Sequence, residues 1–562
     1  MLLALLGPLI GRPFWQGFRA YAYPDQLTYA SIATNWAMGD SRFVEPFTQT
    51  GTSHYPSLWY QAMGLVARLT GAPVHVIWTL FGVLIVSAAV LSTGLLAYRM
   101  SGRAWAPVLP ALALFTGVLA GVTAGQWGLE LLNHAILWGP LASLFTLNAE
   151  AAGTCLVIIA MVLLLGADPG NGGTYRRRSL VIAAAILGAI ANVHTYAFFS
   201  GLVLAVCFAA VLSLLRSRSR PLVVVTVALL AIVLVAGAPL ARVIGPLPVL
   251  ALLLLAFAPA AVALARGHAV TAVLVVLAFG LAAAPQLVRT AWGLAEGDPF
   301  LVFRQVSSRG LGVAIPTGLL AAAPLILVGA ACAVALWRRR QDTKSALLLS
   351  LLVGMGIMSQ NDRWGFNQEP YRFWILFGIL AGVLMTPVLA WSLAQHAWMR
   401  DRRRLAYTVV AVGAGAIWAV SLIDTLSFWH YANVEGVFSM EDQRAQAVRS
   451  LTGERDGLVL TSECLPPQVL KVMTGARIAH YNRGLAWPDN AKELNAFLDK
   501  ERRAAEDPAQ LQRAGVAYVL TDTGCPTDWD FAGDPRVRPE ATREYADADG
   551  RRTLTLWRVD PA

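Results

Sequence analysis

The sequence predicts a polytopic α-helical membrane protein, with about 13 transmembrane helices, followed by a C-terminal α/β domain outside the cytoplasm. Of its 562 residues, 56% are hydrophobic and only 14% are charged, whereas soluble domains have roughly 45–50% and 25%. Apolar runs long enough to cross a bilayer recur along most of the chain. From about His430 onward the composition becomes that of a soluble domain. The composition therefore excludes a soluble enzyme.

The net charge of +10 is unevenly distributed along the chain. Residues from His430 onward carry 17 Lys or Arg against 21 Asp or Glu, so the preceding part carries 27 basic and 13 acidic residues. The excess positive charge therefore belongs to membrane loops. We expect these basic residues to face membrane lipids, and we expect no nucleic-acid partner.

Thirteen apolar runs between charged loops are predicted to span the membrane. They lie near 1–11, 74–98, 105–125, 151–167, 180–195, 197–215, 221–240, 245–265, 269–288, 317–337, 345–360, 372–393 and 405–428. Alternate loops then share 17 Lys or Arg residues, which the positive-inside rule assigns to the cytoplasm. The segment 180–215 is expected to divide around 192–196, and one helix within 221–288 is a candidate re-entrant segment.

The first run, Met1–Gly11, is too short to cross a hydrocarbon core that needs about 20 residues. A cleaved signal peptide and a first helix with a clipped start both fit this length. We favour the helix because no basic segment precedes the run and Ala20-Tyr21-Ala22 is a poor cleavage site.

The C-terminal segment alternates predicted strands with predicted helices, which indicates an α/β domain with a partly parallel sheet. The predicted strands are 457–461, 476–481, 516–521 and 552–558, and the predicted helices are 467–474, 491–506 and 510–514. The predicted domains are thus 1–429, a transmembrane catalytic domain, and 430–562.

Cys464 and Cys525 follow two of these strands at their C-terminal ends. Parallel neighbours would bring both loops to one sheet edge, so we predict a disulfide in an oxidising compartment. The alternative is two free thiols. Zinc binding is not expected, because the sequence has no CxxC motif and no His pair near these cysteines.

Only four lysines stand against 40 arginines. This bias resembles a high-GC bacterial genome, and it makes a bacterial plasma membrane the expected location of this multi-pass protein.

The predicted first external loop, 12–73, holds two amphipathic helices near Asp25–Met38 and Pro56–Leu69. It reads Tyr-Pro-Asp-Gln-Leu-Thr-Tyr-Ala-Ser-Ile-Ala from Tyr23, then Met-Gly-Asp from Met38, and Tyr-Pro-Ser-Leu-Trp-Tyr from Tyr55. This pattern of about 45 residues resembles the GT-C superfamily of membrane glycosyltransferases, in particular the protein O-mannosyltransferase and lipid A aminoarabinose transferase branch. Two departures from that family are Gln26 at the second position of its acidic pair and Ser57 in its Pro-Pro position.

The resemblance implies that Asp25 is the catalytic base, which takes the acceptor proton as the sugar C1–O bond forms. The alternative is a solvated loop acid or a helix N-cap. Glu45, Glu130 and Asp40 are candidates for a second acid, although Asp40 also fits turn chemistry. Because Gln26 replaces the second acid, we favour transfer without a divalent metal and predict no metal ligand.

Arg372 opens the twelfth span within Pro370-Tyr-Arg-Phe-Trp. In the family, an Arg in a comparable setting holds the carrier phosphate, a role that suits the guanidinium fork. The alternatives are interfacial snorkelling and a salt bridge to Glu369. Arg304 and Arg309 belong to a loop that either closes over the donor phosphate or forms a surface helix. Further candidates for substrate contact are His54, Tyr29 and His194, the last of which also fits a hydrogen-bonded core histidine.

These expectations describe an inverting glycosyltransferase that moves a sugar from a polyprenyl-phosphate carrier to an extracytoplasmic glycan, lipid or protein acceptor. One alternative is a transporter or flippase of lipid-linked sugars, which favours charged or broken helices at the bilayer midplane. The other is a non-catalytic scaffold of the same fold.

Overall fold

The computed structural model describes residues 24–114, 144, 147–167, 176–307, 315–395, 442–498 except 454 and 463, 507–525, and 531–561 except 532, 548 and 549. The chain divides into two compact units. Unit 1 comprises residues 1–6, 82–288 and 305–429, and unit 2 comprises residues 7–81, 289–304 and 430–562.

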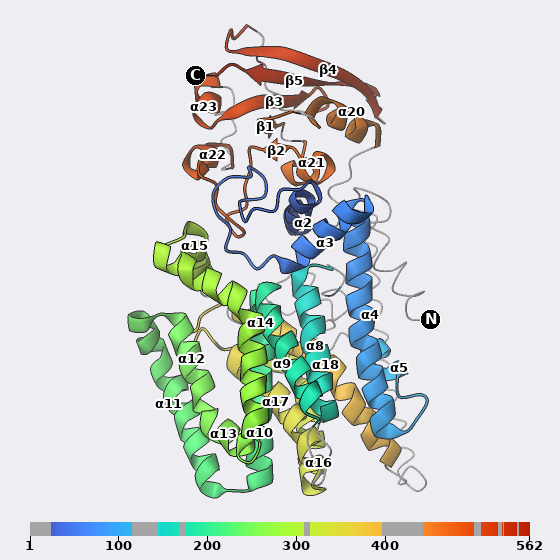
Figure 1. Ribbon diagram of the computed structural model, residues 1–562, viewed down its shortest axis with the longest axis vertical. Coiled ribbons are helices and arrows are strands. Elements are labelled where there is room, and N and C mark those ends of the chain that lie inside the picture. Colours follow the sequence, from blue (N-terminus) through green and yellow to red (C-terminus); the bar gives the residue numbers. More distant parts are fainter. Residues whose placement is uncertain are drawn as a thin grey trace. The chain divides into compact units, whose positions relative to one another are not determined.

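Within the described residues, the regular secondary-structure elements of unit 1 are all helices (Figure 1). It holds α5 (Val108–Ala113), α8 (Ala149–Ala167), α9 (Arg177–Ala189), α10 (Thr195–Ser217), α11 (Arg220–Ile244), α12 (Pro246–Ala256), α13 (Ala258–Ala265), α16 (Ile315–Arg338), α17 (Asp342–Met358) and α18 (Pro370–Gln395). It also holds most of α4 (Val74–Ser101) and α14 (Ala269–Glu296).

Six of the described helices are long and apolar enough to cross a membrane: α4, α8, α10, α11, α14 and α18. The pair α12 and α13 passes the same test as one span bent by 46°. The expected count of 13 spans is not confirmed. The predicted spans at 1–11 and 405–428, and most of 105–125, lie outside the described residues. The number and apolarity of these helices nonetheless indicate a multi-pass membrane protein.

The division expected within 180–215 is present. A 3₁₀ turn at Ile190–Asn192 ends α9, and His194, in an extended conformation, begins α10 by accepting a hydrogen bond from the Ala197 amide at 3.3 Å. Asn192 ties this break to α14, donating to the Ala282 carbonyl at 2.7 Å and accepting from the Gln286 amide at 3.1 Å. Polar groups freed by the break are therefore paired inside the protein, as a membrane requires.

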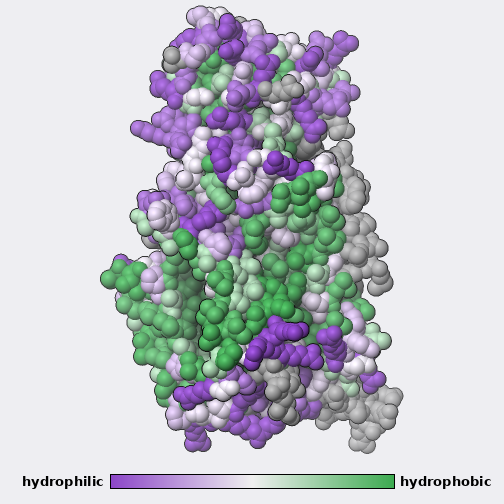
Figure 2. All heavy atoms as spheres, in the orientation of Figure 1, coloured by the Kyte–Doolittle hydropathy of each residue, from purple (hydrophilic) through white to green (hydrophobic). Residues whose placement is uncertain are grey.

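Large apolar side chains remain exposed along the outer helices of unit 1. Val224, Val235 and Val243 on α11 are 65%, 81% and 83% exposed, and Leu281 on α14 is 74% exposed. Figure 2 shows the resulting broad hydrophobic surface over these helices. Hydrophilic residues gather below this surface, at the lower ends of the helices in this view. Such a surface is expected to face lipid, because water does not tolerate an apolar patch of this extent.

Unit 2 contains the two helices expected in the first loop, here α2 (Pro24–Ala37) and α3 (Leu58–Thr70), and the C-terminal elements. The two helices approach closely at Gly64, where a Cβ would lie 2.4 Å from the Ala33 carbonyl oxygen. A larger residue would push the two helices apart. Unit 2 also holds most of α15 (Pro299–Ser307).

The C-terminal sheet has the order β2-β1-β3-β5-β4. Its strands are β1 (Leu458–Thr461), β2 (Arg477–Ile478), β3 (Val516–Asp522), β4 (Val537–Asp547) and β5 (Gly550–Val559), and its helices are α20 (Asp442–Thr452), α21 (Pro467–Thr474), α22 (Ala491–Leu498) and α23 (Pro508–Arg513). β1 pairs in parallel with β2 and β3, whereas β3, β5 and β4 pair antiparallel. The expectation of a partly parallel sheet is confirmed.

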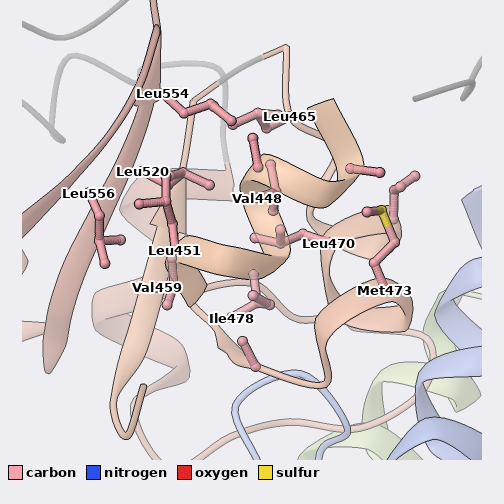
Figure 3. Packing of buried hydrophobic residues seen from close by; sticks show 14 of the residues in the cluster. Val448, Leu451, Val459, Leu465, Leu470, Met473, Ile478, Leu520, Leu554 and Leu556 are labelled. Atoms are coloured by element: carbon pink, nitrogen blue, oxygen red, sulfur yellow. The ribbon is translucent and has the colours of Figure 1, made fainter. Parts of the chain in front are cut away.

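A buried apolar cluster joins α20 and α21 to one face of the sheet (Figure 3). Val448 and Leu451 of α20 and Leu470 of α21 pack with Val459 and Leu520 from the strands. Leu27 of α2 and Phe47 of the first loop belong to the same cluster. The first loop is thereby fixed to the C-terminal domain by shared hydrophobic burial.

Candidate functional site

Asp25 is the second residue of α2, and its side chain lies outside the described residues. The helix itself is held firmly, because α2 contacts both α3 and α21. Gln26, which follows it, is 3% exposed. The expected base thus belongs to the first turn of an anchored helix.

Stacked aromatic rings support the other face of α2. Tyr29 stacks on Tyr55 and on Tyr60, with ring centroids 5.6 and 5.4 Å apart, and Tyr60 stacks on Trp78 at 5.4 Å. Phe300 of α15 meets Tyr55 edge to face at 6.3 Å. Tyr29 therefore belongs to a stack of aromatic rings, and its contact with substrate stays a prediction.

Glu45 is completely buried in the loop after α2. Its Oε2 accepts hydrogen bonds from the backbone amides of Phe47 and Thr48, at 3.0 and 2.7 Å, and from the Thr48 hydroxyl at 2.9 Å. Burial raises the pKa of Glu45 to about 7, although these hydrogen bonds favour the charged form. A carboxylate enclosed in this way organises its own loop, and a role of Glu45 as second acid stays a prediction.

Lys471 of α21 is a buried cation whose charge lowers the pKa of Glu45. Its Nζ donates to the carbonyls of Gly475 and Ala476, at 3.1 and 3.0 Å. Burial lowers the pKa of Lys471 to about 7, and the charge of Glu45 opposes that change. The two residues form an electrostatic link between the first loop and the C-terminal domain, within unit 2.

Asp40 has a local partner. Its Oδ1 accepts hydrogen bonds from the Arg42 side chain at 2.9 Å and from the Arg42 amide at 3.1 Å. The hydrogen bond from the Arg42 side chain lowers the pKa of Asp40. This geometry is that of a turn, the alternative to a second acid at this position.

His54 joins the first loop to the end of α14 and the start of α15. Its Nδ1 donates to the Arg289 carbonyl at 3.0 Å, and its Nε2 lies 3.7 Å from the Asp298 carboxylate. Asp298 also accepts from the Thr52 hydroxyl at 3.1 Å and caps α15 through the Leu301 amide at 3.1 Å. The His54 ring packs against Gly293, where a Cβ would lie 2.8 Å from it. These contacts of His54 hold the first loop against the end of α14 and the start of α15.

Arg372, at the start of α18, is paired with two acids of unit 1. Its Nη1 donates to Glu150 of α8 at 2.9 Å, and its Nε donates to Glu369. The Arg372 guanidinium also lies over the Tyr196 ring, 5.4 Å from its centroid. The salt bridge to Glu369 that the sequence analysis kept as an alternative is present, with Glu150 as a second partner.

The turn before α18 holds Glu369 in place. Asn361 is completely buried, donates to the Gln368 carbonyl at 3.1 Å and accepts from the Gln368 amide at 2.8 Å. Glu369 itself has a positive φ of 34°. A strained backbone conformation of this kind persists only where its surroundings impose it.

The remaining expected residues have mixed outcomes. His194 is 7% exposed and caps α10, so the structure gives it a structural contact. Arg304 lies on α15 and is half-buried. Glu130 and Arg309 lie outside the described residues.

Cys464 and Cys525 are joined in a disulfide, with their Cα atoms 5.5 Å apart. Arg444 of α20 lies against this bridge, its Nη2 2.9 Å from the Cys464 sulfur and 2.7 Å from the buried Asp522 carboxylate. Within the described residues, Cys464, Asp522 and Cys525 are the one group of three side chains with metal-ligand spacing. Because disulfide sulfurs are not thiolate ligands, this group does not fit a metal ion.

Sequence reasoning missed Glu150, Asp298, Arg289 and Lys471. All four interact with residues far away in the chain, and no spacing rule connects such partners. Asp298 carried a local signal, since it follows Gly297 and precedes Pro299, the arrangement of a helix start.

No protein-family model and no curated protein matches this sequence. Among solved structures, the chain is similar to the archaeal oligosaccharyltransferase AglB from Archaeoglobus fulgidus in complex with an inhibitory peptide and a dolichol-phosphate. The identity is 16% and the TM-score 0.46, over 93% of this chain and 69% of that chain. The apo form of the same organism's oligosaccharyltransferase has 15% identity and a TM-score of 0.49, over 93% and 69%.

The arabinofuranosyltransferase AftD from Mycobacteria is also similar, with 12% identity and a TM-score of 0.42, over 97% of this chain and 41% of that chain. These proteins are GT-C membrane glycosyltransferases, the superfamily that the first loop resembles.

Proposed function

We propose that this chain is an inverting membrane glycosyltransferase of the GT-C type, which uses a polyprenyl-phosphate sugar as donor. The observation that carries the proposal is the first loop, where Asp25 begins a helix set among the motif's Gly-Asp turn and Pro-x-Leu-x-Tyr helix. The anchoring of α2 by α3 and α21 supports it, because general-base catalysis requires a positioned carboxylate.

In the proposed reaction, the acceptor hydroxyl attacks C1 of the sugar while Asp25 takes the hydroxyl proton. The bond between C1 and the phosphate oxygen breaks, and polyprenyl phosphate leaves with the bonding electrons. Attack from the face opposite the leaving group inverts the configuration at C1. The proposed acceptor is an extracytoplasmic cell-wall glycan, lipoglycan or glycoprotein, and the proposed location is a bacterial plasma membrane with the C-terminal domain outside.

Arg372 remains the proposed ligand of the donor phosphate. Its guanidinium contacts Glu150 through Nη1 and Glu369 through Nε, so a phosphate oxygen is expected to bind Nη2 or to replace one of these carboxylates. Arg304 and Arg309 remain proposed contacts of the same phosphate. No metal takes part in the proposed reaction.

The test is transfer from a radiolabelled polyprenyl-phosphate sugar in membranes that hold the parent or Asp25→Asn at equal amounts. Asn keeps the size of Asp but does not accept a proton, so transfer should fall about 10²-fold while donor binding persists. Asp40→Asn is the matched control, because Asp40 lies in the same loop and pairs only locally with Arg42. Parent-level transfer by Asp25→Asn would contradict the assignment of the base.

Absence of transfer by the parent with every donor would instead favour the transporter or the scaffold. Lipid-linked sugar flipping in proteoliposomes separates these two, since only a transporter moves the donor between leaflets.

A further inference from the structure

A cavity of about 670 Å³ lies in unit 1 where α10 ends and α11 begins. Its walls come from the ends of α10 and α12, the first turn of α11, and α13. The wall formed by α12 and α13 changes direction there, because these two helices are bent by 46° at Phe257. The volume falls within the range of small-molecule and cofactor sites.

The polar part of the cavity consists of hydrogen-bond donors. Ser217 Oγ accepts from the Ser219 amide, and Ser219 Oγ accepts from the Leu222 amide, both at 3.4 Å. Each hydroxyl has an O–H left to donate, since these contacts use only its oxygen. Arg266 adds the guanidinium, and no ion pair within 4 Å involves it among the described residues.

The charges around the cavity select an anion. No acidic side chain lines it, whereas Arg218 lies between its two serines in the chain and Arg220 follows them. A guanidinium with two hydroxyls suits a phosphate group, which accepts several hydrogen bonds at once.

The remainder of the cavity is apolar and open. Leu222, Leu255 and Val262 line it, and Leu255 and Val262 are 61% and 56% exposed. Val224, two residues further along α11, is 65% exposed. An occupant therefore needs hydrocarbon directly attached to its anionic group, which free phosphate does not have.

We propose that this cavity binds the headgroup of an anionic glycerophospholipid, with Arg266, Ser217 and Ser219 on the phosphate and the acyl chains along α11 and α13. The clustered arginines support this occupant, because basic residues at a membrane surface attract the anionic lipids of the adjoining leaflet. The proposal goes beyond sugar transfer and does not depend on it.

The test is native mass spectrometry of the full chain in detergent, with phosphatidylglycerol or phosphatidylcholine of identical acyl chains added. Phosphatidylglycerol should be retained preferentially, and Arg266→Gln should weaken its binding about tenfold, the effect of losing a charge-assisted hydrogen bond. Arg103→Gln, an exposed arginine outside the cavity, is the charge-matched control and should bind like the parent. Ala263→Phe fills the cavity without changing the charge and should also weaken binding.

Three results would overturn the proposal. Equal losses from Arg103→Gln and Arg266→Gln would show diffuse attraction to basic loops. Parent-level binding by Ala263→Phe would remove the cavity from the interaction. Displacement of phosphatidylglycerol by an equal concentration of polyprenyl phosphate or inorganic phosphate would replace the proposed occupant by a carrier lipid or a free anion.

Discussion

Arg372 on α18 donates to Glu150 on α8 across 2.9 Å, so one guanidinium ties two helices of unit 1 together. Glu369, three residues before Arg372, accepts from the Nε of the same guanidinium. The three side chains are 22%, 15% and 6% exposed, which means that removing the cation leaves two poorly solvated carboxylates.

Arg372→Lys should therefore impair both stability and donor use. A lysine keeps the charge, but its ammonium does not reproduce the fork that reaches Glu150 and Glu369. We expect a loss of about 2 kcal/mol in the free energy of unfolding, the order of one lost charged hydrogen bond. Thermal unfolding in detergent measures stability, and the donor concentration for half-maximal transfer measures donor use.

Glu150→Gln separates the two roles of Arg372. Removing this carboxylate charge frees part of the guanidinium while Glu369 remains in place. If Arg372 binds the donor phosphate, the Glu150→Gln variant should then bind donor at least as tightly as the parent does, despite a lower melting temperature. Weaker donor binding in Glu150→Gln, in proportion to its loss of stability, would leave Arg372 as a helix-pairing residue only.

The link between Glu45 and Lys471 predicts two opposite dependences of stability on pH. The pKa of Glu45 is raised from 4.5 to about 7, so its contribution to stability is present below pH 4.5 and lost as pH rises through 7. The pKa of Lys471 is lowered from 10.5 to about 7, so its contribution is present above pH 10.5 and lost as pH falls through 7.

Glu45→Gln should therefore remove the fall in stability between about pH 4.5 and 7, and Lys471→Met should remove the rise above pH 7. Melting temperatures of the parent and both variants from pH 4.5 to 9 check this, as differences from the parent. Asp40→Asn is the control, because Asp40 is partly exposed and pairs with Arg42. Parallel curves for all four proteins would show that the two buried groups do not titrate in this range.

Local patterns in the sequence predicted the helices of the first loop and much of the C-terminal domain. Pro467–Thr474 is a helix with the predicted bounds, because Pro466 and Gly475 mark its ends. β4 was not predicted, since its charged residues and Pro539 argue against a strand. It is an edge strand with an irregularity between Pro539 and Ala541, where a missing amide donor is tolerated.

The candidate site was less predictable than the fold. Motif reasoning singled out Glu45 and His54 by position, but their partners Lys471 and Asp298 lie far away in the chain. Whether an acid faces a substrate or its own loop depends on burial, and Glu45 proves fully buried. Tertiary packing decides such roles, and no local pattern encodes them.

The disulfide between Cys464 and Cys525 predicts that both thiols resist alkylation unless a reductant is added. Non-reducing peptide mass spectrometry of protein purified from membranes checks the bond. The bridge closes a loop with a sequence separation of 61, so its removal should cost about 4 kcal/mol of C-terminal domain stability. Limited proteolysis should then cleave that domain faster in Cys464→Ser/Cys525→Ser, and Cys332→Ala should behave like the parent. Complete alkylation without reductant would contradict the bond.

The packing of His54 on Gly293 predicts that the effect of Gly293→Ala on stability changes sign when the His54 ring is removed. Glycine within α14 costs about 1 kcal/mol relative to alanine by helix propensity, so Gly293→Ala should stabilise the helix if space allows. The added Cβ would lie 2.8 Å from the His54 ring, which the Arg289 carbonyl holds in place at 3.0 Å.

Gly293→Ala should therefore lower the melting temperature of the parent but raise that of His54→Ala, where the ring is absent. The Leu301 side chain also lies 2.8 Å from the added Cβ, but its flexible end is able to turn away. Unfolding of the four proteins of this double-mutant cycle gives the coupling free energy, which we expect to exceed about 1 kcal/mol. Additive effects would mean that His54 does not fix the first loop against α14. Transfer activity in Gly293→Ala should fall together with stability, since displacing His54 moves the loop that follows α2.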